Sequence, residues 1–161
     1  MNERARTLIA ALEMQPHPEG GYYREIYRSP DTVQPQDGRG ERSALTTIYF
    51  LLTAGQVSRW HRVLSDEVWH HYEGDPLELL WLSHDLTVCH RAVLGPVREG
   101  VTPVATVPAG CWQAARPTGD HTLVGCTVGP GFDFHDFTLI SPESDIAPTI
   151  RTRFPHLASL I

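Results

Sequence analysis

The chain has 161 residues, which is enough for one domain with its own hydrophobic core. Its formal net charge is −6, and it has no stripe of basic residues, so we expect no nucleic-acid partner. No stretch approaches the roughly 18 consecutive apolar residues that a membrane span needs, so we expect no membrane partner either.

The cysteine pattern and the N-terminus both indicate a cytoplasmic location. The three cysteines, Cys89, Cys111 and Cys126, are an odd number without CxxC spacing. They therefore predict neither a disulfide framework nor a cysteine zinc site. The first residues, MNERARTLIAALEM, lack the apolar segment of a signal peptide.

A short amphipathic helix is predicted at the N-terminus. Its apolar side chains recur at helical spacing, at Ala5, Leu8, Ile9 and Leu12. Pro16 and Pro18 end it. Residues 22–28 then look extended, and the polar segment 29–41, rich in Pro, Asp and Gly, is predicted to be a surface loop.

From residue 43 onward the pattern predicts almost continuous β-structure. Short segments rich in β-branched and aromatic residues alternate with turns, at 43–52, 56–63, 67–72, 77–82, 86–94, 101–107, 112–115, 122–128 and 134–140. Such regular spacing indicates a sandwich or barrel. After residue 141 we expect a tail with one or two helical turns that covers a barrel edge. No linker interrupts the chain, so residues 1–161 are predicted to form a single domain.

The segment 55–74 contains the most informative group of polar residues. Alternate residues of a strand share one face, so His61 and Val63 point the same way. A tight turn follows, and Glu67, Trp69 and His71 share a face of the next strand. Imidazole and carboxylate are therefore predicted to converge inside a barrel.

A second element begins at Pro108 and Gly110, which build a turn into a strand. The third residue after the glycine returns to the interior. That residue is Gln113, which we expect near His61 and Glu67.

These two elements resemble the motifs of the cupin superfamily. The first motif, G-x5-H-x-H-x3,4-E-x6-G, and the second, P-x-G-x2-H, are matched at Gly55, His61, Glu67, Gly74, Pro108 and Gly110. The chain departs from them at two places, because Val63 and Gln113 stand where the family has histidines.

The chain also resembles one small group of single-domain cupins of unknown function. The shared segments are HPEGGYY at 17–23, TTIYFLL at 46–52, SDExW at 65–69, PAGxWQ at 108–113 and GFxFxDF at 131–137. The resemblance implies an all-β fold, a double-stranded β-helix (cupin or jelly-roll barrel), with a short N-terminal helix and a C-terminal tail. It brings no settled reaction.

The resemblance raises the question of a metal. Cupins with two or three histidines and a glutamate bind iron, manganese, nickel or zinc. Here the corresponding set would be His61, Glu67 and Gln113, with His71 as a possible second imidazole. One imidazole and one carboxylate make a poor site for most transition metals. We therefore expect no cofactor, and a weakly held divalent metal is the alternative.

A histidine beside a carboxylate in a cleft can also transfer protons, because its pKa lies near neutrality. Sugar-nucleotide 3,5-epimerases are cupins that use a pocket histidine as base with a tyrosine as acid. The leading prediction is a small-molecule-binding cupin, epimerase-like or isomerase-like, that acts on a carbohydrate-like or other polar metabolite. In it His61 is the base and Glu67 orients it. A metal-dependent oxygenase or isomerase and a non-catalytic metabolite-binding module remain as alternatives, and so does a purely structural His–Glu hydrogen bond.

Further ligand contacts are predicted around this pair. Gln113 and His71 would hold ligand oxygens, and Trp69 would form a wall of the pocket. The Gly20-Gly21 turn would present a rim that carries Glu19, Tyr22 and Arg24. Open strand edges also predict a homodimer, with the strand at 46–52 and the N-terminal segment as the contact regions.

Overall fold

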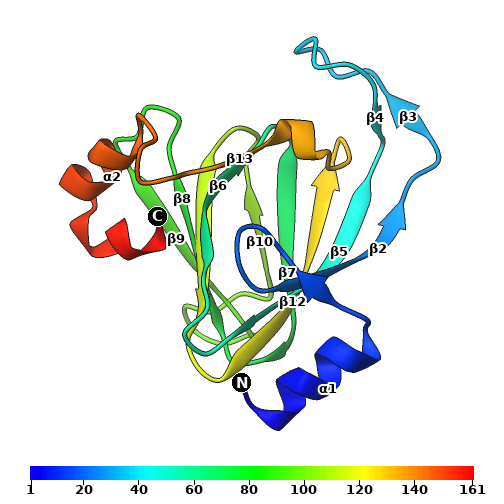
Figure 1. Ribbon diagram of the computed structural model, residues 1–161, viewed down its shortest axis with the longest axis vertical. Coiled ribbons are helices and arrows are strands. Elements are labelled where there is room, and N and C mark those ends of the chain that lie inside the picture. The colour runs from blue at the N-terminus through cyan, green and yellow to red at the C-terminus, as the bar shows by residue number, and fades with distance from the viewer.

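Two antiparallel sheets pack face to face and form the barrel in Figure 1. The computed structural model describes residues 1–161. The larger sheet has the strand order β1 (Gln15–Pro16), β2 (Tyr22–Arg28), β5 (Thr46–Thr53), β12 (His121–Gly129), β7 (Asp66–Gly74), β10 (Val104–Val107). The smaller has the order β13 (Phe137–Leu139), β6 (Ser58–Val63), β11 (Trp112–Pro117), β8 (Leu77–Leu82), β9 (Cys89–Leu94). This architecture confirms the predicted all-β jelly-roll barrel.

The barrel interior is filled by the alternate residues that face inward from each strand. Phe50 and Leu52 of β5 belong to the same buried cluster as Val124 and Cys126 of β12. Trp69 of β7 packs edge-on against Phe50, with ring centroids 5.9 Å apart. Burial of each such side chain contributes about 1.5–3 kcal/mol, so the alternating pattern fixes which strand face turns inward.

The N-terminal helix α1 (Glu3–Ala11) packs on the outer face of the larger sheet. Ala5 and Leu8 of the helix are buried against Leu51 and Leu123, which point outward from β5 and β12. Asn2 caps the helix, because its side-chain oxygen accepts a hydrogen bond from the Ala5 amide. The helix is nine residues long, and none of the helices combines the length and hydropathy required to cross a membrane.

The C-terminal tail covers a sheet face rather than the predicted barrel edge. It forms α2 (Ala147–Arg153) and the 3-10 helix η2 (Pro155–Leu160). Ile150 and Leu157 are buried in one cluster with Trp60 and Leu80, on the outer face of the smaller sheet. The indole nitrogen of Trp60 donates to the carbonyl of Leu157, which holds the tail in place. The tail covers this face because β6 and β8 direct apolar side chains outward there, and these must be shielded from water.

The segment 134–140 is only partly the strand that its aromatic residues predict. It begins as the 3-10 helix η1 (Phe134–Asp136) and continues as the short strand β13. Asp133 caps the turn by accepting from the amide of His135. Asp136 is buried and ion-paired with Arg42. Because this contact holds Asp136 in the turn, the strand begins only at Phe137.

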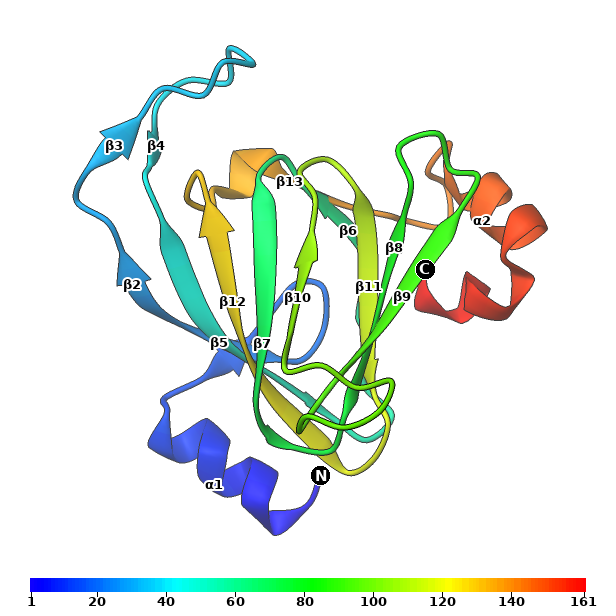
Figure 2. The same ribbon diagram turned by 180° about the vertical axis from the view of Figure 1, so that it is seen from behind.

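The short strand β3 (Thr32–Val33), within the predicted surface loop, pairs with β4 (Arg42–Ser43), which follows directly after that loop. They form an arm that projects from the barrel between β2 and β5 (Figure 2). The guanidinium groups of Arg39 and Arg42 both contact Asp136, so the base of the arm is tied to the segment after β12.

Candidate functional site

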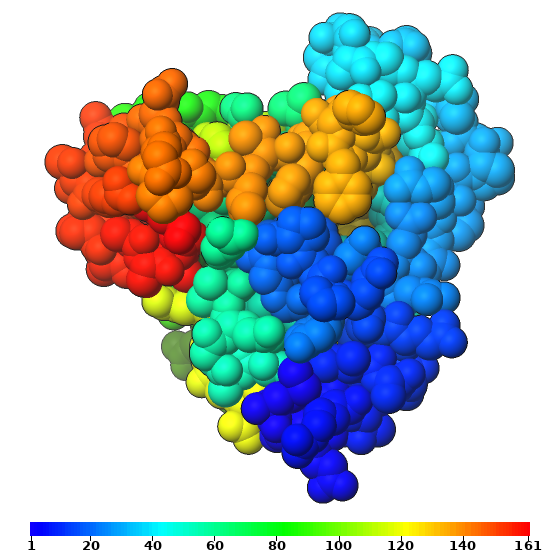
Figure 3. Space-filling view, in the orientation of Figure 1, coloured from blue at the N-terminus to red at the C-terminus, as the bar shows by residue number.

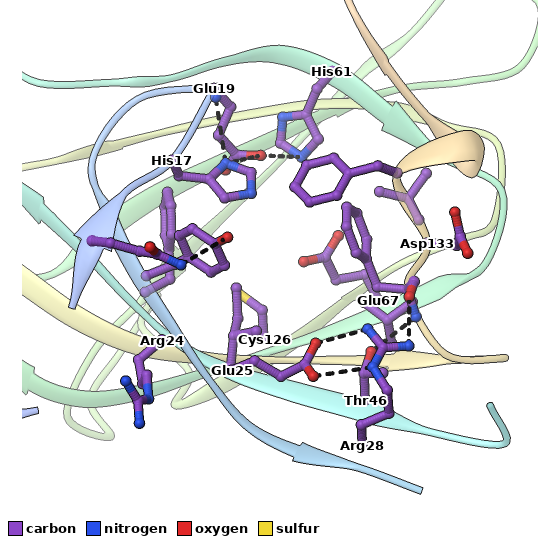
Figure 4. A pocket seen from close by; sticks show the side chains of 18 of the residues that line it. His17, Glu19, Arg24, Glu25, Arg28, Thr46, His61, Glu67, Cys126 and Asp133 are labelled. Carbon is purple, nitrogen blue, oxygen red and sulfur yellow. Dashed lines mark hydrogen bonds and ion pairs between the residues drawn. The ribbon is translucent and has the colours of Figure 1, made fainter. Parts of the chain in front are cut away.

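A cavity of about 640 Å³ opens at the end of the barrel between β2 and the segment 132–135. Its apolar wall consists of Tyr23, Ile48, Phe50, Val63, Val128, Phe132 and Phe134. Its titratable side chains are His17, Glu19, Arg24, Glu25, Arg28, His61, Glu67, Cys126, Asp133 and His135. Figure 4 shows the histidines and Glu19 along one side of the opening and the Glu25–Arg28 ion pair across from them.

One wall of the cavity is a strap formed by residues 17–21, which joins β1 to β2. Figure 3 shows this N-terminal part of the chain lying beside the segment around residue 135. Gly20 has a φ of +116°, and a Cβ there would collide with the carbonyl oxygen of Val57. The amide of Arg59 donates to the carbonyl of Glu19 at 2.9 Å. The glycine therefore lets the strap lie directly on β6. In this position the Glu19 side chain lines the cavity.

The Glu19 carboxyl lies between two imidazoles. Its Oε2 is 3.3 Å from Nε2 of His61 and 3.5 Å from Nδ1 of His17. Its Oε1 accepts a hydrogen bond from the hydroxyl of Ser58 at 2.8 Å. All three titratable side chains are almost completely buried. The arrangement is a carboxyl–imidazole cluster supplied by the strap and by β6.

Burial controls the protonation of this cluster. It raises the pKa of Glu19 to about 8, because a carboxylate loses its hydration there, although Ser58 and the positive charge of Arg59 oppose the shift. Burial, together with the neighbouring His61, lowers the pKa of His17 to about 4. Burial also lowers the pKa of His61. Near neutral pH the cluster therefore favours uncharged imidazoles and a protonated carboxyl.

Glu67 occupies a separate part of the cavity wall. Its Oε2 accepts from the amide nitrogen of Gln113 at 2.5 Å, and the amide oxygen of Gln113 accepts from the indole of Trp69 at 3.0 Å. Burial raises the pKa of Glu67 to about 7, while the nearby His61 and the contacts with Gln113 and Cys126 oppose the shift. The partner of His61 is thus Glu19, whereas the strand pattern pointed to Glu67.

Of the remaining predicted ligand contacts, only Arg24 lines the cavity, and Tyr22, Trp69 and Gln113 do not. Arg24 reaches the cavity rim, where it is half exposed and pairs with Glu13 at 3.0 Å. Tyr22 instead packs outward into the cluster around helix α1. Trp69 and Gln113 are buried behind Glu67 and hold it, and neither lines the cavity.

His71 also lies away from the cavity. Its backbone is in register with Val124, a core residue, so it does share the inner face with Glu67 and Trp69. It sits farther along β7, however, and is not among the residues that line the cavity. Strand parity predicts the face of a residue but not its depth in the barrel.

The sequence pattern missed His17 as a site residue. His17 was part of the recognised HPEGGYY segment, but no spacing rule links it to His61, which is far away in the chain. Its ring is surrounded by aromatic side chains, with Tyr23 edge-on at 4.7 Å, Phe134 stacked at 6.2 Å, and Phe50 and Phe137 each at 5.9 Å. A histidine beside a Gly-Gly turn that must approach another strand is the only local signal.

Comparison with known proteins identifies the family of the chain. The family model described as Cupin superfamily (DUF985) matches residues 6–140. This chain belongs to that family. An uncharacterized protein of Saccharomyces cerevisiae is 27% identical to the cupin over 154 residues, which is 86% of this chain and 76% of the yeast protein.

Solved structures show the same fold. A hypothetical protein from Leishmania major has a TM-score of 0.84 and 34% identity, over 98% of this cupin and 96% of that chain. A protein from Shewanella oneidensis has a TM-score of 0.82 and 35% identity, over 97% and 93% of the two chains. Oxalate decarboxylase from Bacillus subtilis, at 13% identity and a TM-score of 0.58 over 37% of its chain, shares the fold alone.

The side chains of this cupin do not fit the metal centre that the superfamily implies. Val63 offers no donor atom, and both ends of the Gln113 amide are already hydrogen-bonded. Nδ1 of His61 lies 2.8 Å from the carbonyl of Arg59, and its Nε2 faces Glu19. No group of three or more His, Cys, Asp or Glu side chains is arranged to hold an ion. No chemical step is therefore assigned to a metal.

Proposed function

We propose that this cupin binds a small polar metabolite and transfers a proton on it, as an isomerase-like or epimerase-like enzyme. The carrying observation is that one cavity brings together the Glu19–His61 contact and the buried carboxyl of Glu67. General acid–base catalysis commonly uses imidazoles placed beside carboxyl groups, and here burial raises the pKa values of the two carboxyl groups toward neutrality.

Glu67 and the cluster around Glu19 lie in separate parts of the cavity wall, and we assign each a different role in proton transfer. Glu67 has a pKa of about 7, so a substantial protonated fraction exists near neutral pH. In that form its hydroxyl can donate to a carbonyl oxygen, and this makes a C–H bond beside the carbonyl more acidic. The cluster of Glu19 with His17 and His61 then exchanges the proton of that C–H bond. A carbohydrate-like hydroxy-carbonyl compound is the substrate class that suits both parts.

The charges around the cavity favour an uncharged ligand over a multiply anionic one. The carboxyl groups of Glu25 and Asp133 line it with two guanidinium groups, those of Arg24 and Arg28, whereas burial favours the uncharged form of the Glu19 and Glu67 carboxyls. Arg24 already pairs with Glu13. Arg28 is already engaged by both carboxylate oxygens of Glu25. A compact anion would therefore find no free, buried cation in the cavity.

The direct test is to identify the ligand that copurifies with the protein and to follow its hydrogen atoms. Native mass spectrometry would give its mass, and NMR in D2O would show whether the protein exchanges a carbon-bound hydrogen with solvent. We expect exchange with the wild type. We expect His61→Gln to retain a ligand-induced rise in melting temperature but to lose exchange. His156→Gln, at an exposed position on η2 outside the cavity, is the control and should retain both.

A bound ligand without exchange or conversion would instead indicate a non-catalytic binding module. Activity that requires an added divalent metal would indicate the metal-dependent alternative. We also propose a cytoplasmic location, which the three unpaired cysteines support.

A further inference from the structure

The tautomers of the two buried histidines follow from their neighbours. The backbone amide of Glu19 donates to Nδ1 of His17 at 3.3 Å, so Nδ1 carries no proton and Nε2 does. Nδ1 of His61 lies 2.8 Å from the carbonyl of Arg59, which can only accept. His61 therefore carries its proton on Nδ1, and its Nε2 is a bare acceptor.

Glu19 consequently faces two bare nitrogens with one oxygen. Its Oε2 contacts Nδ1 of His17 at 3.5 Å and Nε2 of His61 at 3.3 Å. Three lone pairs directed at one another would repel unless one atom carries a proton. A proton on Oε2 relieves this repulsion and can donate to one of the two nitrogens at a time, while Oε1 accepts from Ser58. The high pKa of Glu19 agrees with this assignment.

The same geometry determines which nitrogen can reach a ligand. Nδ1 of His61 is occupied by the carbonyl of Arg59, and its Nε2 lies 3.3 Å from Oε2 of Glu19, which stands between it and His17. Nε2 of His17 makes no hydrogen bond within the protein, and Figure 4 shows it directed toward the open centre of the cavity. The His17 side chain is 6% exposed, so this donor is held in place yet has no partner.

We propose that His17 is the catalytic residue that exchanges a proton with the ligand through Nε2, and that Glu19 supplies or takes up the compensating proton at Nδ1. This inference rests on the proposed function and deepens it. His61 becomes a positioning residue, because it holds the Glu19 carboxyl in line with His17. The substrate class is a compound with a C–H bond beside a carbonyl, with that C–H near His17 and its oxygen near Glu67.

The protons balance in both directions. When the ligand takes the Nε2 proton of His17, the O–H bond of Glu19 breaks, its proton moves to Nδ1, and the electron pair stays on Oε2. The resulting carboxylate is stabilised by the hydroxyl of Ser58 and the positive charge of Arg59. A substrate that still holds its C–H proton reacts in the reverse direction. The Nε2 proton first leaves to solvent as the Glu19 proton moves to Nδ1. The carbon-bound proton then passes to the bare Nε2, the C–H electron pair stays on the enolate whose oxygen faces Glu67, and the Nδ1 proton returns to Glu19.

The first experiment requires no ligand. Long-range 1H–15N NMR of the labelled protein at pH 7 reports the tautomer of each histidine. We expect the neutral Nε2–H form for His17 and the neutral Nδ1–H form for His61. The Nδ1–H form or an imidazolium at His17 would overturn the proposal. In either form Nδ1 already carries a proton, so it could not take up the proton of Glu19 when Nε2 donates to the ligand.

The second experiment measures deuterium incorporation from D2O into dihydroxyacetone, D-ribulose and D-fructose. We expect a decrease of about 100-fold or more for His17→Asn and for Glu19→Gln, in keeping with the 10²–10⁴-fold contribution of general acid–base groups. His156→Gln, at an exposed position on η2 outside the cavity, is the matched control, and the melting temperature of each variant checks that it folds. Wild-type exchange that His17→Asn leaves unchanged overturns this inference alone. An inactive wild type overturns the proposed function, and this inference with it.

Discussion

The amide of Gln113 donates to the Glu67 carboxyl at 2.5 Å and accepts from the indole of Trp69 at 3.0 Å. The residue in a usual metal-ligand position thus serves as a hydrogen-bonded bridge. It fixes the direction of a carboxyl that would otherwise be buried on an apolar wall.

Replacement of Gln113 by Leu is expected to destabilise the fold by about 2–4 kcal/mol. It leaves the Trp69 N–H and the Glu67 carboxyl without their partners, and each buried unsatisfied group costs about 1–3 kcal/mol. Urea denaturation measures the change in the free energy of unfolding. Gln15→Leu is the matched control, because Gln15 makes an exposed hydrogen bond, and its change should stay within about 0.5 kcal/mol. Equal effects of the two substitutions would contradict the bridge.

The fold was largely predictable because burial imposes a period of two on the strands. The predicted segments 22–28 and 77–82 coincide with β2 and β8. The inward direction of His61 and Glu67 follows from the same alternation, and both line the cavity. The pairing of two sheets then follows from the number and spacing of the strands.

The contacts within the site could not be predicted in this way. Strand parity gives the face of a residue but neither its depth nor its partner, which is why His71 lies away from the cavity and Glu19 replaces Glu67 beside His61. The position of Glu19 depends on a strap that crosses onto β6, and no periodic pattern describes such a segment. The turn at 134–136 depends on the ion pair of Asp136 with Arg42, a contact between residues far apart in the chain.

The strap can be tested through its glycine. Gly20→Ala is expected to destabilise the protein by more than about 2 kcal/mol, because the new Cβ collides with the Val57 carbonyl and the residue must keep a positive φ. Gly38→Ala is the control for φ alone, since Gly38 has a φ of +78° with open space around it. That substitution should cost about 1 kcal/mol. Similar losses for both would show that the strap does not need its close approach to β6.

The buried carboxyls and imidazoles predict a distinctive dependence of stability on pH. Glu19 and Glu67 have folded pKa values of about 8 and about 7, raised from 4.5, so their contribution is complete below pH 4.5 and is lost as pH rises through 7 to 8. His17, lowered from 6.5 to about 4, contributes fully above pH 6.5 and loses its contribution as pH falls toward 4. Below pH 6.5 the contributions of the carboxyls and of His17 to the free energy of unfolding change in opposite directions with pH. Above pH 6.5 only the contribution of the carboxyls changes.

The free energy of unfolding should therefore fall between pH 6.5 and 8, by about 1–2 kcal/mol per pH unit. Glu19→Gln should remove roughly half of this slope, because the amide does not titrate. Glu143→Gln, at an exposed position, is the control and should leave the slope unchanged. Urea denaturation at a series of pH values measures all three proteins. A wild-type stability that rises over this range would contradict the raised carboxyl pKa values.

The strand at 46–52, expected as a dimer contact through an open edge, is β5, which pairs with β2 on one side and β12 on the other and so has no open edge. We therefore predict a homodimer through side chains exposed on the outer face of the larger sheet. The Tyr72 side chain is half exposed, lies over Gly125 and packs edge-on against Tyr49 at 6.0 Å. Light scattering at micromolar concentration should give twice the chain mass of 18.0 kDa. Tyr72→Glu should shift the protein toward the monomer, whereas Val97→Glu, in the loop between β9 and β10, should not. A monomeric wild type would reject the prediction.

The final prediction concerns metal affinity. Because Val63 has no donor atom and Gln113 is occupied by Glu67 and Trp69, dialysis of the wild type against a chelator should leave no stoichiometric iron, manganese, nickel or zinc. The double substitution Val63→His with Gln113→His should add two imidazoles, since Val63 lines the cavity and Gln113 lies in register with His61.

Elemental analysis after dialysis with zinc and then chelator compares the two proteins. We expect about one zinc per chain in the double variant, because three imidazoles and one carboxylate form a favourable zinc site. Val63→Leu with Gln113→Leu is the control for the loss of the native side chains. Stoichiometric metal in the wild type would show that the native donors suffice. In that case the loss of the metal in His71→Ala would identify a rearrangement that brings His71 to the ion.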